Sequence, residues 1–182
     1  MPEGNDVSWL KRFLGKHEDD RGDPLDQRVE LELFADYYQF YLQDEQAKGD
    51  LSQAWTEQAV ERLMALAPAT VGVGTVRNMT VPVTIEVRRS EPADDLEAWD
   101  QVNDCSIEVS SGRLVVAGCT DYFPDARRVV VPPGCYRVRL FYGKLDRLSE
   151  DELEGDDLYR VVLWPGDPAE PRVIKQRNLG RA

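Results

Sequence analysis

The sequence predicts a mainly β protein, an antiparallel β-sandwich or open barrel of about 8–10 strands with one packed α-helix. Short segments in which apolar and polar residues alternate recur along the chain, as they do in half-buried strands. Turn-forming pairs such as Ser111-Gly112 and Pro165-Gly166 separate these segments. The pattern has no strand–helix–strand rhythm, so we expect no parallel nucleotide-binding sheet.

The chain has 182 residues, a length suited to one domain. We expect a polar N-terminal leader over residues 1–27, a single β-sandwich domain over 28–176 and a C-terminal tail over 177–182. Apolar residues at helical spacing in the leader predict a short helix with one apolar face, formed by Val7, Leu10, Phe13 and Leu14.

The domain is expected to begin with two strands. From Val29 to Leu33 apolar residues alternate with glutamates, which predicts a strand with one buried face. A second strand is predicted from Tyr37 to Gln43, and Ala35-Asp36 is the expected break between the two.

One strong helix is predicted after these strands. Asp50 or Ser52 can cap its N-terminus, and Pro68 would end it after Ala67. Its apolar stripe, expected to cover a sheet face, consists of Trp55, Ala59, Leu63 and Leu66.

The remainder of the domain is predicted to consist of strands. Gly72 and Gly74 fall within one of them, and we interpret them as strand glycines because the third glycine, the lysine and the helix of a phosphate-binding loop are missing. Ser111-Gly112 predicts a tight hairpin. The segments are 70–76, 79–88, 105–109, 114–116, 129–131, 135–142, 158–164 and 173–174.

Composition restricts the function. The chain has 22 Lys and Arg residues and 34 Asp and Glu residues, which gives a net charge of −12. This charge would repel nucleic acid and favours a basic protein or a cation as the partner. We expect no catalytic residue, because the single histidine, His17, lies in the leader. The three cysteines lack metal-ligand spacing and are interpreted as buried or inert thiols, although pairing of Cys119 with Cys105 or Cys135 is left open. We expect no metal ion and no cofactor.

Neither a membrane segment nor a secretory signal is expected. No apolar run approaches the ~20 residues that cross a bilayer. The first residues lack the basic and apolar regions of a signal peptide. Together with the cysteine usage, this predicts a cytoplasmic protein.

The acidic residues gather in two runs between predicted strands. The first lies within residues 91–104 and contains Trp99, which could anchor the loop or serve as an interface hot spot. The second, within 146–157, is opposed by Arg147 alone. Exposed acidic loops could simply keep the protein soluble, or they could attract a basic partner. The candidate partner-binding residues are Asp94, Asp95, Glu97, Asp100, Glu152, Glu154, Asp156 and Asp157.

The order of several short motifs resembles the bacterial competence protein J family, the inhibitors of the DNA-uptake nuclease. The motifs are Tyr37-Tyr38-Gln39-Phe40, Trp55-Thr56-Glu57-Gln58-Ala59, Gly74-Thr75-Val76-Arg77-Asn78, Val81-Pro82-Val83, Ser111-Gly112-Arg113-Leu114, Pro133-Gly134-Cys135-Tyr136-Arg137-Val138 and Asp156-Asp157-Leu158-Tyr159. The resemblance spans residues 29–164 and implies a compact, mostly β protein that binds a nuclease and blocks it. Residues 146–157 look inserted relative to that pattern, and no inhibitory residue is carried over.

The leading hypothesis is therefore an inhibitor or immunity-type protein rather than an enzyme. Its acidic face would occupy the basic cleft of a nuclease or toxin, in place of the phosphates of the substrate. Two alternatives remain open at this point. One is a structural or adaptor β-sandwich that binds proteins without inhibiting them, and the other is a glycosidase-type enzyme that uses two carboxylates.

Overall fold

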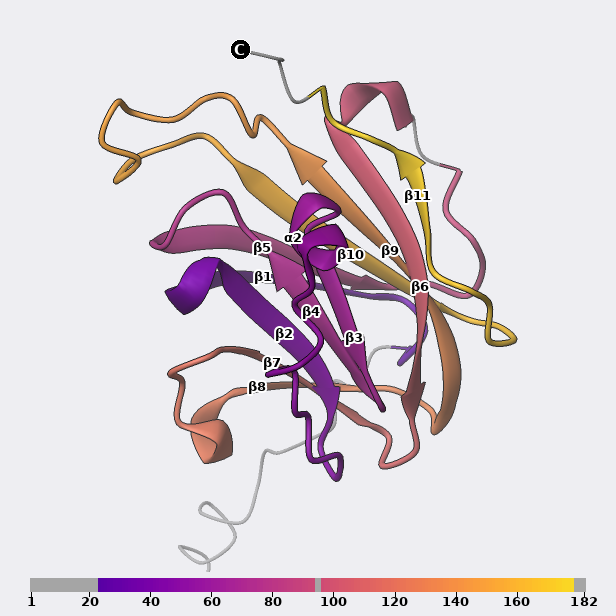
Figure 1. The fold of residues 1–182 in the computed structure, drawn as a ribbon. Helices are drawn as coiled ribbons and strands as arrows, with labels where there is room; N and C mark the ends of the chain where they lie inside the picture. Colours follow the sequence, from indigo (N-terminus) through magenta and orange to yellow (C-terminus); the bar gives the residue numbers. More distant parts are fainter. Residues whose placement is uncertain (1–22, 94–95, 179–182) are drawn as a thin grey trace, which may run out of the picture.

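Eleven strands in two sheets carry the structure, a computed structural model that describes residues 23–93 and 96–178 (Figure 1). The six-stranded sheet has the order β1-β5-β10-β9-β6-β11 and the five-stranded sheet the order β3-β4-β2-β7-β8. One apolar core, to which strands of both sheets contribute, lies between them. The fold is thus mainly β and sandwich-like, as the sequence predicts.

The strands of the first sheet are β1 (Gln27–Phe34), β5 (Thr80–Val87), β10 (Leu158–Pro165), β9 (Gly134–Gly143), β6 (Gln101–Val109) and β11 (Arg172–Lys175). Those of the second are β3 (Met64–Ala67), β4 (Thr70–Gly74), β2 (Gln39–Asp44), β7 (Arg113–Gly118) and β8 (Arg127–Val130). The helical elements are α2 (Glu57–Glu61) and the 3-10 turns η1 (Asp36–Tyr38), η2 (Leu96–Ala98) and η3 (Phe123–Asp125).

The core is formed by the alternating residues that define the strands. Three tyrosines and a phenylalanine are among its largest fully buried side chains. Tyr159 contacts Phe40 and Tyr142 edge-on, with ring centroids 6.1 and 6.0 Å apart. Because Phe40 comes from one sheet and both tyrosines from the other, these contacts join the two layers.

The predicted helix from Asp50 or Ser52 to Ala67 is wrong in extent. The helix has five residues, and the chain turns at Leu63, whose φ is +54°, into strand β3. β3 then pairs with β4 around Ala69, whose φ is +50°. The apolar spacing was helical, but a hairpin satisfies the backbone of residues 64–67 and still buries Met64.

The predicted hairpin at Ser111-Gly112 is also wrong. A tight turn is present, with Gly112 at φ +73°, but β6 pairs with β9 while β7 pairs with β2 and β8. The turn therefore carries the chain from one sheet to the other. A turn signal specifies a reversal of the chain and leaves the partner of each strand open.

The pairing and number of strands also differ from expectation. β5 and β10 are parallel, so the first sheet is mixed rather than antiparallel throughout. Eleven strands are described, one more than the upper bound predicted. The second strand begins at Gln39 because Tyr37 and Tyr38 belong to η1. The helix predicted in the leader and His17 fall outside the described residues.

A smaller apolar cluster covers the outer face of the six-stranded sheet. Val102, Phe141, Val162 and Trp164 are buried there, and Trp99 packs against them with its ring centroid 5.1 Å from that of Phe141. Of the two roles that the sequence allows for Trp99, the packing supports the anchor.

All three cysteines are free thiols. Cys105 is buried, and burial raises the pKa of its thiol to about 12. Cys119 is exposed, so of the two alternatives, buried or inert, only an inert thiol remains for it, and partial burial raises the pKa of this thiol. Among the described residues, no group of three or more metal-ligating side chains occurs, and no helix is long and apolar enough to cross a membrane.

Glu86 is the centre of a charge cluster on the six-stranded sheet. Its carboxylate accepts hydrogen bonds from Arg28, Arg88 and Arg160 at 2.5–3.1 Å. Burial by itself would raise the pKa of Glu86, but the hydrogen bonds from Arg160 and Arg88 outweigh it, so this pKa lies below its ordinary value of 4.5. The ionised form is thus favoured by folding.

Replacing Glu86 by glutamine is expected to lower the free energy of unfolding by about 1–3 kcal/mol at pH 7, because three guanidinium groups lose a charged acceptor. A carboxyl whose pKa is lowered by folding stabilises the protein above pH 4.5 and loses that effect as the pH falls below it. Urea unfolding at pH 7 and pH 3 should therefore show a smaller acid-induced loss for E86Q than for the wild type. Glu30→Gln, at an exposed partner of Arg28, is the control. Equal acid sensitivity of E86Q and wild type would contradict this assignment.

Candidate functional site

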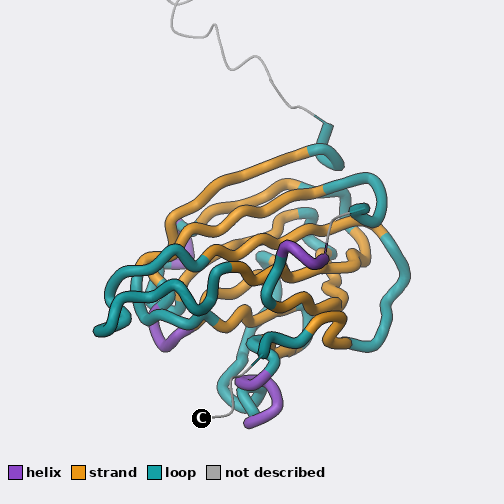
Figure 2. Tube along the Cα trace, turned by 90° about the horizontal axis from the view of Figure 1, so that it is seen from above, coloured by secondary structure: helices purple, strands orange, loops and turns teal. Residues whose placement is uncertain are grey.

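The second acidic run forms one exposed loop, residues 144–157, which joins β9 to β10 and is called the acidic loop below. It projects at the upper left in Figure 1 and stands out from the strands again when seen from above in Figure 2. None of its exposed carboxylates forms an ion pair with another described residue. They belong to Asp146, Glu150, Asp151, Glu152, Glu154 and Asp156.

Hydrogen bonds within the acidic loop hold its shape. Ser149 N donates to Glu154 O at 2.8 Å, and Asp156 N donates to Arg147 O at 2.9 Å. The Asp151 carboxylate accepts from Ser149 Oγ at 2.6 Å and from Leu153 N at 3.2 Å, and these hydrogen bonds lower the pKa of Asp151. The loop is therefore a defined hairpin-like structure that presents its acids outward.

A buried ion pair fixes the base of the acidic loop. Arg77 Nε donates to Asp157 Oδ1 at 2.6 Å, and the side chains are 6% and 0% exposed. The hydroxyl of Tyr159 donates to Asp157 Oδ2 at 2.8 Å. Arg77 Nη1 also donates to the carbonyl of Leu153 at 3.1 Å, which ties the tip of the loop to the core. The loop is thus held at its base and near its tip.

Asp157 is therefore not an exposed residue of the acidic face. The sequence grouped it with its neighbours because they form an unbroken acidic run, whereas the structure places its carboxylate inside the protein. Sequence reasoning also missed Arg77. A lone arginine after a strand carries no signal of its own, and its role depends on a contact 80 residues away in sequence.

The described part of the first acidic run is largely neutralised. Asp104 is buried and bound by Arg139 at 2.7 Å, with Arg172 at 3.1 Å. Glu91 binds Arg139 at 2.6 Å, and Glu97 binds Lys175 at 3.3 Å. Asp94 and Asp95 lie outside the described residues. The described acids of this run thus present less unpaired charge than their sequence indicates.

The structure nevertheless brings the two runs to the same end of the molecule. The Asp100 carboxylate accepts a hydrogen bond from Leu145 N, at the start of the acidic loop, at 2.8 Å. A polar groove of about 510 Å³ lies between the runs. It is lined by Glu97, Asp100 and Asp146 together with Lys175 and Arg177.

A second, more apolar groove of about 660 Å³ lies on the other side of Leu145 and Arg177. Its lining includes Tyr37 and Tyr38 of η1, Trp55, and one residue of the acidic loop, Glu152. In the strand predicted from Tyr37 to Gln43, the two tyrosines would point to opposite faces, so the prediction contained no sign of this groove.

The fold matches two solved structures. One is a crystal structure of ComJ from Bacillus subtilis, an inhibitor of the DNA degrading activity of NucA, with a TM-score of 0.58 and 16% sequence identity, covering 78% of this chain and 98% of ComJ. The other is crocagin biosynthetic gene J, with a TM-score of 0.53 and 22% identity, covering 78% of this chain and 99% of that chain. No family model and no curated protein matches the chain. The resemblance to competence protein J is thus confirmed for the fold.

Proposed function

We propose that this protein is an inhibitor or immunity-type protein that binds a basic partner, such as a nuclease, through the acidic loop. The observation that carries the proposal is the set of exposed carboxylates in residues 146–156, unpaired with other described residues and held on a loop anchored by Arg77 and Asp157. A fixed array of negative charge can pair with the lysines and arginines that bind phosphate in a nuclease cleft. The likeness to ComJ, itself a nuclease inhibitor, supports the same function.

The alternatives receive less support. A glycosidase-type site needs two carboxylates facing one substrate, and Glu152 is the one carboxylate that lines the aromatic groove within the described residues. In the polar groove Glu97 pairs with Lys175, and the Asp100 carboxylate accepts a hydrogen bond from Leu145 N, so two of its three carboxylates are already engaged. An adaptor that binds proteins without inhibiting them would not need several carboxylates on one anchored loop. We therefore propose an inhibitor rather than an enzyme, and we keep the expectation of a cytoplasmic protein as part of this proposal.

The test is inhibition of DNA degradation by the purified chain. NucA and any nuclease found to be encoded beside the gene of this protein are assayed on plasmid DNA at increasing ratios of inhibitor to enzyme. We expect complete inhibition of at least one of these nucleases near a one-to-one ratio. Undiminished degradation by all of them at tenfold molar excess would refute the proposal, and binding without inhibition would favour the adaptor.

A further inference from the structure

The apolar groove has the size and lining of a binding site for side chains. Its volume of about 660 Å³ lies within the range of about 300–1,000 Å³ that is usual for ligand pockets. Its apolar lining is formed by Trp55, Val60, Leu63, Val76, Leu145 and Leu148. The indole of Trp55 is fixed by a hydrogen bond to Gln39 Oε1 at 2.6 Å, so this wall is preorganised.

Tyr37 and Tyr38 stand at the edge of this groove in a conformation that tyrosine disfavours. Their φ angles are +57° and +58°, in the left-handed region that suits glycine or asparagine. Tyr38 N donates to Ala35 O at 3.1 Å, and Thr75 N donates to Tyr38 O at 2.8 Å, so the backbone is held in place. The side chains are 72% and 51% exposed and contribute little to the core. The stability of the fold does not explain why two exposed tyrosines occupy these left-handed positions, whereas contact of their rings with a binding partner does.

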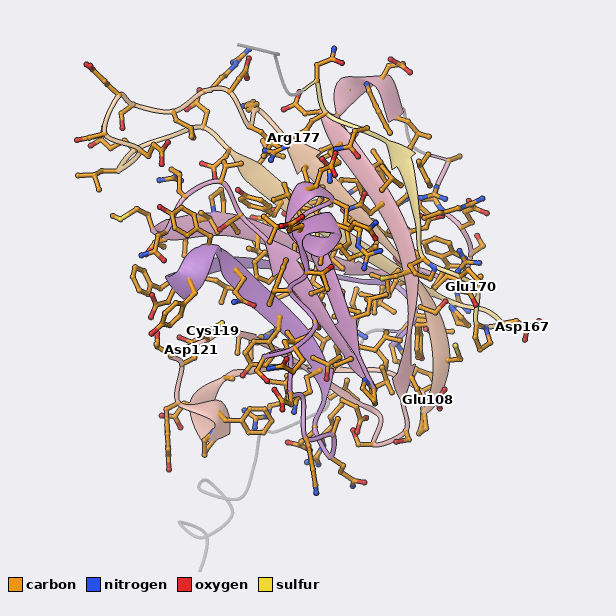
Figure 3. The ribbon with its side chains drawn as sticks, in the orientation of Figure 1. Glu108, Cys119, Asp121, Asp167, Glu170 and Arg177 are labelled. Atoms are coloured by element: carbon orange, nitrogen blue, oxygen red, sulfur yellow. The ribbon has the colours of Figure 1, made fainter. Side chains whose placement is uncertain are left out.

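The charges around the groove define what it can receive. Glu152 lines it and belongs to the acidic loop. Glu150, Asp151 and Glu154 are the exposed carboxylates of this loop nearest to Glu152 in sequence. Arg177, which is labelled in Figure 3, is the one cationic side chain in the lining among described residues. Its Nε is buried and has no hydrogen-bond partner. An occupant could therefore place cations against the loop and a carbonyl oxygen against Arg177.

We propose that the apolar groove binds an aromatic or large apolar side chain of the partner that is flanked by lysine or arginine. The side chain enters between the two tyrosines and Trp55, and its cationic neighbours pair with Glu152 and the adjacent carboxylates. This inference rests on the proposed function and names the chemistry that the partner presents.

Three short peptides test the proposal without any nuclease: Ac-Lys-Trp-Lys-NH₂, Ac-Glu-Trp-Glu-NH₂ and Ac-Lys-Ala-Lys-NH₂. Each is titrated into the ¹⁵N-labelled full chain and followed by NMR. We expect the Lys-Trp-Lys peptide to shift the Trp55 indole signal and the amide signals of residues 37–38 and 74–76. Its affinity should exceed that of the Glu-Trp-Glu peptide about fivefold at low salt and that of the Lys-Ala-Lys peptide about tenfold.

A double variant separates binding from folding. Tyr37→Asn/Tyr38→Asn is expected to keep or raise Tm, because asparagine tolerates the left-handed region, and to weaken Lys-Trp-Lys binding about tenfold. Tyr122→Asn, at a tyrosine that is 71% exposed and lines neither groove, is the matched control and should leave binding unchanged.

Four results would overturn the proposal. The first three are equal affinity for the three peptides, NMR signals that shift only outside the groove, and unweakened peptide binding by the double tyrosine variant. The fourth concerns the full-chain variant Leu10→Ser/Phe13→Ser, and it is peptide binding that appears in this variant but not in the wild type. The last would show that the leader of this chain fills the groove itself. Peptide binding combined with failure to inhibit any nuclease would refute the proposed function and leave the groove assignment standing.

Discussion

Replacing Arg77 by leucine is expected to lower the free energy of unfolding by about 3–5 kcal/mol, the largest effect we predict for a single residue. The change leaves the Asp157 carboxylate buried without its cation and removes the hydrogen bond that reaches Leu153. Urea unfolding measures the loss of stability. Digestion by a glutamate-specific protease should show faster cleavage within the acidic loop, because the loop is no longer tied to the core.

A double variant distinguishes the buried charge from the lost contact. Arg77→Leu/Asp157→Leu removes both partners, and it should recover part of the stability while the acidic loop remains sensitive to protease. The recovery is incomplete because the buried Tyr159 hydroxyl loses its acceptor. If R77L were destabilised by less than about 1 kcal/mol, with an unchanged cleavage rate, the ion pair would not be the anchor described here.

Neutralising the acidic loop is expected to weaken nuclease inhibition about 10- to 100-fold, the second large effect, mainly through slower association. The variant combines Glu150→Gln, Glu152→Gln, Glu154→Gln and Asp156→Asn. Asp151 is kept because it accepts hydrogen bonds from Ser149 and Leu153. Tm should not fall, because none of the four acids is ion-paired with another described residue. The inhibition constant at low salt is the measurement.

A control with the same change in net charge is available on other surfaces. It combines Glu108→Gln, Asp125→Asn, Asp167→Asn and Glu170→Gln. Figure 3 shows Glu108, Asp167 and Glu170 together, far from the acidic loop. If position matters as well as total charge, the control should inhibit nearly as well as the wild type. If both variants lost inhibition equally, the weaker inhibition would be due to the change in net charge and not to the position of the acidic loop.

The strands were predictable where a single pattern governs a segment. From Thr80 to Val87 and from Leu158 to Trp164, the residues with apolar side chains define the buried face, and the observed strands match within one or two residues. The presence of one real helix and of a final short strand near Val173 also followed from local signals. The exposed acidic loop was visible as a charge run between two strands.

The remaining features depend on contacts that are distant in sequence. Residues 52–67 have helical spacing, yet pairing with β4 makes part of them a strand. In the sequence, nothing distinguishes Asp157 from the exposed acids that precede it, and its burial depends on the ion pair with Arg77. Tyr37 and Tyr38 alternate like strand residues, and their exposure follows from a turn held by Thr75 and Asn78. Local periodicity carries none of this information.

The most direct test of the central claim, that charge on the acidic loop guides the partner, is the association rate with an inhibited nuclease at low and high salt. Electrostatic attraction between exposed charges is screened over about 10 Å at 0.1 M salt. The rate for the wild type should fall about tenfold or more between 20 and 300 mM salt, and the neutralised variant should show a much flatter dependence. A wild-type rate that does not change with salt, or the same dependence in both proteins, would contradict the claim.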